Sequence, residues 1–208
     1  MNAHDILIID GLQYVNWNRE LFEQAKRGGV NIIHVTIAYW ENKKEVTENI
    51  VNWDKKFNDH ADLIMPIKIA DDITTAEKNG KIGIIFGFQN CSPIEDDVRL
   101  IEKMHHMGAR IMQLSYNNQS LLATGCYENG DSGITRFGKV AIKEMNRLGM
   151  VIDMSHSAEL STIEAIEISE RPIAITHDNP SSFHDALRNK SDTVLKNLSQ
   201  SEGMLGVS

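Results

Sequence analysis

The chain has 208 residues, of which 41% are hydrophobic and 24% are charged, enough to bury a sizeable core within one domain, residues 1–208. Lys and Arg number 21 and Asp and Glu number 29, so the formal net charge is −8, which excludes an electrostatic case for nucleic acid or an anionic membrane surface as partner. Apolar runs stay far below the roughly 18 residues that span a bilayer, and Asp5 stands where a signal peptide has basic residues, so we expect a cytoplasmic protein.

A polar or basic stretch that ends in glycine and is followed by a β-branched apolar run recurs five times. Glycine after a helix accepts the left-handed conformation that closes it. Helical patterns lie between these junctions, and we expect helices over Ser92–Met107, around Val140–Leu148 and around Ile163–Ile168. Helices and strands therefore alternate. The five junction glycines are Gly29, Gly80, Gly108, Gly149 and Gly203.

The apolar runs are mostly continuous, which is typical of strands buried on both faces of a parallel sheet. A doubly wound open sheet and a (β/α) barrel both fit such a pattern. Polar residues gather where nearly every strand ends, which favours a TIM-barrel-like (β/α)8 fold of the α/β class, incomplete because only about seven strands are found. The predicted strands are Ile6–Asp10, Val30–Ala38, Lys81–Phe86, Arg110–Ser115, Met150–Ser155, Pro172–Thr176 and Met204–Val207.

His156 and His177 follow the fifth and sixth of these strands and lie 21 residues apart. Two imidazoles at the ends of adjacent parallel strands can bind one metal ion, although histidines that end strands are also common as structural residues. Gln89, after the third strand, adds a neutral amide oxygen as a weaker ligand. Asp153 precedes His156 by three residues and should face the other side of its strand. Asp178 is expected to support the site rather than to bind the ion.

Three further residues are candidates for binding or catalysis. Arg188 could hold a substrate carboxylate with its guanidinium fork, with Asn189 beside it, and a plain surface arginine is the alternative. Tyr116 could donate a hydrogen bond from its phenol to a carbonyl oxygen, or could simply pack at the mouth of the barrel. Neither a Gly-x-Ser-x-Gly elbow nor a catalytic Cys–His arrangement is present in the sequence, so nucleophilic catalysis has no support.

Three stretches, Gly133–Gly138, Lys143–His156 and Arg171–His177, resemble the renal-type membrane dipeptidases, which are zinc enzymes on a (β/α) barrel that cleave free dipeptides. The resemblance covers most of the chain. It implies that His156 and His177 are metal ligands and that Arg188 with Asn189 holds the carboxylate of a dipeptide.

This sequence departs from the family where the family's chemistry is located. The His-x-Asp pair that ends the family's first strand is replaced by Leu12 and Tyr14, and the glutamate that bridges two zinc ions is replaced by Gln89. Tyr116 matches the histidine that contacts the substrate carbonyl, and the chain stops before the strand that carries an acidic residue near the substrate amine. Two zinc ions repel strongly without a bridging carboxylate.

These departures leave three functions open. The first is a metal-dependent dipeptidase with at most one zinc or other divalent ion, held by His156, His177 and Gln89. The second is a relative that binds a small ligand without catalysis, and the third is an inactive, shortened fragment. An unclosed barrel exposes two sheet edges, so we also expect a homodimer or aggregation.

Overall fold

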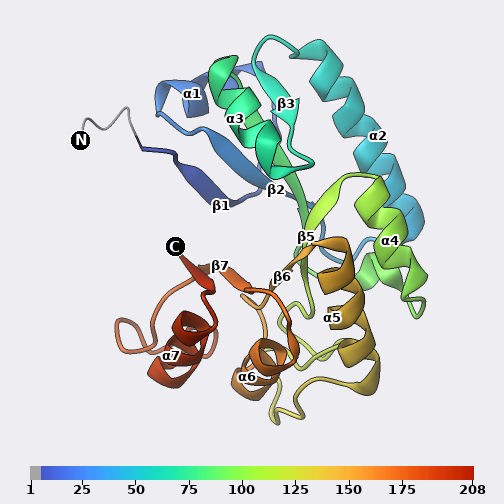
Figure 1. Ribbon diagram of the computed structural model, residues 1–208, viewed down its shortest axis with the longest axis vertical. Helices are drawn as coiled ribbons and strands as arrows, with labels where there is room; N and C mark the ends of the chain where they lie inside the picture. Colours follow the sequence, from blue (N-terminus) through green and yellow to red (C-terminus); the bar gives the residue numbers. More distant parts are fainter. Residues whose placement is uncertain (1–5) are drawn as a thin grey trace.

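The computed structural model describes residues 6–208 as a ring of parallel strands with helices on the outside (Figure 1). Asp5, on which the expectation about a signal peptide rests, lies outside the described residues. The strands are β1 Ile9–Gln13, β2 Ile32–Ala38, β3 Ile64–Pro66, β4 Ile82–Phe88, β5 Ala109–Gln113, β6 Val151–Asp153, β7 Ala174–Asp178 and β8 Met204–Val207.

Seven strands form the path β1-β2-β4-β5-β6-β7-β8, and all the pairings are parallel. The predicted α/β barrel is therefore confirmed, with Met204–Val207 at its predicted bounds. The first predicted strand is shifted, because pairing with β2 begins only at Ile9. The path bends round until β1 approaches β7, since Gly11 of β1 lies against the carbonyl of Thr176 in β7.

The sequence analysis missed β3, which is only three residues long and ends in Pro66. This strand lies off the main path and pairs with the first half of β4, from Ile82 to Ile84. The second half of the same β4 edge pairs with β5, from Phe86 onwards. One edge of β4 thus serves two neighbours in turn, which the apolar pattern of β4 alone does not reveal.

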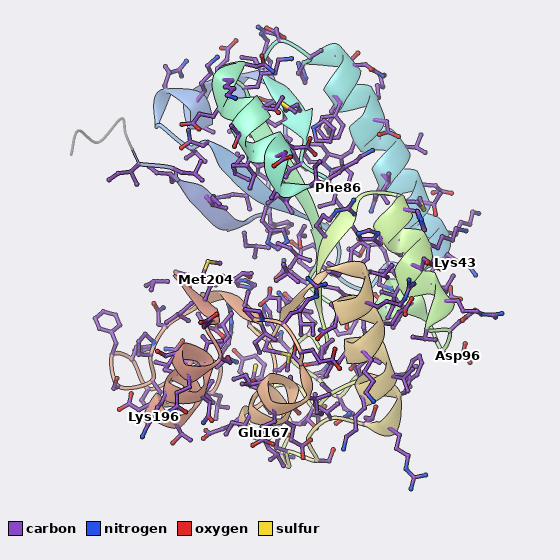
Figure 2. All side chains as sticks on the ribbon, in the orientation of Figure 1. Lys43, Phe86, Asp96, Glu167, Lys196 and Met204 are labelled. Atoms are coloured by element: carbon purple, nitrogen blue, oxygen red, sulfur yellow. The ribbon has the colours of Figure 1, made fainter. Side chains whose placement is uncertain are left out.

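The helices lie on the outer side of the strands, as Figure 1 shows. Helix α2, Lys43–Asp59, packs against β4 through Trp53 and Phe57. The ring centroids of these two residues lie 5.7 and 5.8 Å from that of Phe86 in β4. Figure 2 shows Phe86 inside this layer, whereas Glu167 and Lys196 lie on outer helix faces. The helices are α1 Arg19–Arg27, α2 Lys43–Asp59, α3 Ala70–Lys78, α4 Arg99–His106, α5 Arg136–Leu148, α6 Glu159–Ile168 and α7 Asp192–Gln200.

The helix predicted over Ser92–Met107 is wrong in its first half. Only a short 3₁₀ turn, Ser92–Ile94, forms there, and α4 begins at Arg99. Glu95 breaks the run because its φ is 49°, outside the helical region, and its carboxylate lies 3.4 Å from Lys43 instead of capping a helix.

Four of the five junction glycines do adopt positive φ, but at the fifth the left-handed residue is Glu202 rather than Gly203. Within residues 6–208, no helix is both long and apolar enough to cross a bilayer.

Candidate active site

A cavity of about 610 Å³ opens at the carboxyl ends of the barrel strands. Side chains from β1 and β7 and from the segments that follow β2, β4, β5, β6 and β7 line it, as expected for a parallel barrel. The cavity brings together five of the six residues that the sequence indicated: Gln89, Tyr116, His156, His177 and Arg188.

The sixth residue, Asn189, does not line this cavity. Its amide nitrogen donates to the carbonyl of His184 at 2.7 Å, and its amide oxygen accepts from the main-chain nitrogen of Asn179 at 3.3 Å. These contacts brace the loop that carries Arg188. Direct contact of Asn189 with a substrate stays a prediction.

His156 and His177 point their Nε2 atoms at one another across 3.1 Å, and both rings are buried. The Nδ1 atom of His156 lies 2.7 Å from Oδ1 of Asn117, which can only accept a hydrogen bond, so Nδ1 carries the proton. Nε2 of His156 is then left with its lone pair free. Asn117 follows β5 with a left-handed φ of 65°, and the sequence analysis gave no sign of its role.

The partner of His177 is Thr176, which in turn is held by a buried carboxylate. The Thr176 hydroxyl donates to Asp153 at 2.6 Å and lies 2.7 Å from Nδ1 of His177. Because that hydroxyl proton is used by Asp153, Nδ1 of His177 is the donor to Thr176 and its Nε2 is free as well. Asp153 also accepts hydrogen bonds from Ser155 and Gln113, at 2.6 and 3.0 Å. It therefore orients His177 indirectly, through Thr176.

Both imidazoles are held neutral. Burial, assisted by the nearby charge of Arg188, lowers the pKa of His156 to about 3. Burial likewise lowers the pKa of His177 to about 4, against the attraction of Asp153. Two neutral rings with converging lone pairs are the form in which histidine binds a metal ion.

Asp178 holds the guanidinium group of Arg188 in place. The Nε atom of Arg188 lies 2.9 Å from Oδ1 of Asp178 and its Nη2 donates to the carbonyl of His177. The buried Lys190 lies 3.3 Å from Oδ2 of the same carboxylate and donates to the carbonyls of Ser155 and Ser157, at 3.1 and 2.8 Å. Burial raises the pKa of Asp178 to about 6, although both cations oppose this shift.

Tyr116 stacks on His156 with ring centroids 4.3 Å apart and a tilt of 36°. It also meets Tyr39 and Trp40 edge to face, at 5.8 and 5.5 Å. Gln89 is buried in the same cavity wall. Tyr116 is therefore placed beside the two histidines, where its phenol can reach a bound carbonyl group.

The donor set suits one metal ion and not two. Zinc–nitrogen bonds of 2.0–2.1 Å at a tetrahedral angle place two nitrogens about 3.3 Å apart, close to the 3.1 Å between the Nε2 atoms. Among residues 6–208, no group of three His, Cys, Asp or Glu side chains gathers to hold a metal. Leu12 and Tyr14 line the cavity without offering a charged ligand.

A model of the membrane dipeptidase family, peptidase family M19, matches residues 13–208. The chain belongs to this family. The resemblance seen in the sequence is thereby confirmed, and the metal-dependent character of M19 peptidases agrees with two histidines at the carboxyl ends of β6 and β7.

Two curated relatives are dipeptidases by name. An uncharacterized dipeptidase of Schizosaccharomyces pombe is 29% identical over 170 residues, which cover 78% of this chain and 39% of that protein. The dipeptidase TcpJ of Claviceps purpurea is 26% identical over 141 residues, which cover 67% of this chain and 33% of that protein. The chain thus spans little more than a third of the length of these relatives.

Solved structures show the same fold. An amidohydrolase of Pseudomonas aeruginosa superposes with a TM-score of 0.95 at 39% identity, covering 98% of this chain and 62% of that one. A metallopeptidase of Rhodobacter sphaeroides, liganded with a phosphinate mimic of the dipeptide L-Ala-D-Ala, superposes with a TM-score of 0.84 at 17% identity, covering 97% and 73%.

Proposed function

We propose that this chain is a hydrolase of dipeptides or closely related small amides that depends on one divalent metal ion. The observation that carries the proposal is the pair of free Nε2 atoms of His156 and His177, which lie 3.1 Å apart. Each ring is held in place by a hydrogen bond that its Nδ1 donates. Membership of the M19 family supports the substrate class. Zinc is the first choice of ion, since imidazole suits it.

Three tasks of the proposed reaction can be assigned to residues: holding the ion, binding the substrate carboxylate and polarising the scissile carbonyl. His156 and His177 would hold the ion, and Gln89 could add its amide oxygen. A divalent ion bound there supplies a Lewis acid and a water of lowered pKa. Arg188 binds the free carboxylate of the substrate through the donors that Asp178 and the carbonyl of His177 leave unused. Tyr116 donates a hydrogen bond to the carbonyl of the scissile amide.

The neutral residues of the cavity favour a second candidate function, which is binding without hydrolysis. Leu12, Tyr14 and Gln89 supply no charge to balance a cation, and two imidazoles alone bind a metal ion less tightly than a set that includes carboxylates. The barrel and Arg188 would still hold a small carboxylate. Metal-dependent turnover of any dipeptide by the wild-type chain would contradict this second candidate.

Metal content decides between these candidates first. We expect about one zinc or manganese ion per chain when untagged protein is purified without chelator and analysed by elemental mass spectrometry. His156→Ala should lose the ion, because only one imidazole remains. The matched control is His184→Ala, which removes an exposed histidine that does not line the cavity and should keep it. Wild-type protein that takes up no metal from excess zinc would contradict the proposal.

Activity is measured next on the same three proteins. A panel of dipeptides, with zinc, manganese or cobalt supplied, should be turned over by the wild type and by His184→Ala. Turnover should fall to background in His156→Ala. Equal rates in wild type and His156→Ala would mean that the activity does not come from this site.

We place the protein in the cytoplasm as part of this proposal. Cys91 and Cys126 are buried and free, which suits a reducing compartment. The expected partner is the small-molecule substrate, with no nucleic acid and no membrane surface.

A further inference from the structure

One side of the cavity is made of four aromatic rings, and the proposed reaction uses only one of them, Tyr116. We call Tyr14, Tyr39, Trp40 and Tyr116 the aromatic wall; all four line the cavity. Neighbouring rings meet nearly at right angles, with centroids 5.3 Å apart for Tyr14–Tyr39 and 5.8 Å for Tyr39–Tyr116, and 5.5 Å for Trp40–Tyr116. Several aromatic rings around one cavity are also what forms the aromatic cages that bind ammonium ligands.

The wall keeps much of its ring surface open. Tyr14 is 72% exposed and Trp40 is 60% exposed, although each of these rings could bury apolar area if it folded against the core. Open aromatic faces gathered around one cavity are a feature of ligand sites.

The charges of the cavity are separated. Arg188 provides positive charge beside the histidines, whereas Glu41 and Glu45 provide negative charge on the side of the aromatic wall. Glu41 Oε2 accepts from the main-chain nitrogens of Tyr39 and Trp40, and Glu45 Oε2 accepts from that of Asn42. These bonds fix the carboxylates next to the rings. A zwitterion would therefore place its carboxylate at Arg188 and its cation at the wall.

The type of cation follows from what the wall offers. A primary ammonium group is strongly hydrated and needs three hydrogen-bond acceptors when it leaves water, whereas four aromatic rings stand beside two carboxylates on this side of the cavity. Ring faces attract a cation without accepting such bonds, and they suit methylated ammonium groups best. We propose that the preferred ligand of this cavity is a dipeptide-like zwitterion whose amino terminus is N-methylated, with that cation against the aromatic wall and its carboxylate on Arg188.

This inference rests on the proposed function, because it names the substrate class of the same site. Three acylglycines that differ only at the amino end test it: N,N,N-trimethylglycylglycine, unmodified glycylglycine, and 3,3-dimethylbutanoylglycine, which has the same shape without charge. Affinity is measured by isothermal titration calorimetry on the purified protein. NMR of each sample afterwards detects free glycine and so reports hydrolysis separately.

We expect the trimethylated compound to bind about five- to tenfold more tightly than its neutral isostere, as cation–π attraction predicts, and more tightly than glycylglycine. Trp40→Leu should remove most of this difference. The matched control is Tyr127→Leu, whose ring is 53% exposed and lies outside the cavity lining; it should leave the order of affinities unchanged. Arg188→Gln should weaken all three compounds alike.

Two results would overturn the inference. Equal binding of the trimethylated compound and its neutral isostere would mean that the wall recognises only apolar shape. Tighter binding of glycylglycine would mean that a primary amine is preferred. The proposed function can fail independently: tight binding of the trimethylated compound without any release of glycine supports the inference and contradicts hydrolysis.

Discussion

At the scale of single residues, Asp178 connects the parts of the site. Its carboxylate is 1% exposed and faces two cations, Arg188 at 2.9 Å and Lys190 at 3.3 Å. A buried carboxylate with two cations leaves one positive charge in excess, which suits a site that must bind a substrate carboxylate. Lys190 in turn holds the carbonyls on both sides of His156. Arg188 and His156 are thus positioned by one buried ion cluster.

The ion pairs of Asp178 lead to a prediction for a single substitution. Asp178→Asn should lower the free energy of unfolding by about 3 kcal/mol, because it leaves the buried ammonium of Lys190 without a counter-charge. It should also weaken dipeptide binding, since Arg188 loses its anchor. Urea denaturation and calorimetry measure the two effects.

The double variant Asp178→Asn with Lys190→Met separates the effect on stability from the effect on ligand binding. Stability should return in part because no unpaired charge stays buried, while ligand affinity should stay low. Wild-type stability in Asp178→Asn alone would show that the ion cluster does not hold this part of the barrel.

At the scale of elements, the approach of β1 to β7 depends on a glycine. A Cβ at Gly11 would lie 2.4 Å from the carbonyl oxygen of Thr176, far inside van der Waals contact. Thr176 is the residue that holds Nδ1 of His177. Strand closure and the position of one proposed metal ligand are therefore coupled.

We expect Gly11→Ala to destabilise the protein by about 2 kcal/mol or more, since main chain must move to relieve the contact. Metal affinity should fall with it, because His177 shifts. Gly130→Ala is the matched control: nothing lies within 4 Å of its added Cβ and its φ is not left-handed, so stability should change by less than about 0.5 kcal/mol. Thermal unfolding and zinc titration measure both variants, and wild-type behaviour of Gly11→Ala would contradict the coupling.

At the scale of the whole molecule, the strand path has two ends, β1 and β8, with no pairing between them in the described part of the chain. Met204 and Val207 of β8 are 55% and 74% exposed. Unpaired, apolar edge strands associate readily with other edges. The homodimer expected from the sequence stays a prediction on this ground, as does the single domain over residues 1–208.

Sedimentation velocity tests for the homodimer, and denaturant unfolding tests for the single domain. We expect a dimer whose fraction rises with protein concentration, and one cooperative unfolding transition. The control is a Val207→Lys variant, which places a charge on the exposed edge and should shift the protein towards monomer. A concentration-independent monomer would contradict the edge-pairing argument.

The sequence by itself determined the alternation of helices and strands, the barrel and the positions of His156, His177 and Arg188, because these follow from periodicity and from short motifs along the chain. Only the tertiary structure decided what surrounds them. The hydrogen bonds of Asn117 and Asp153, the ion cluster on Asp178 and the gathering of four aromatic rings join residues far apart in sequence. The break at Glu95 and the short strand β3 were likewise decided by packing against neighbours, which outweighs local propensity.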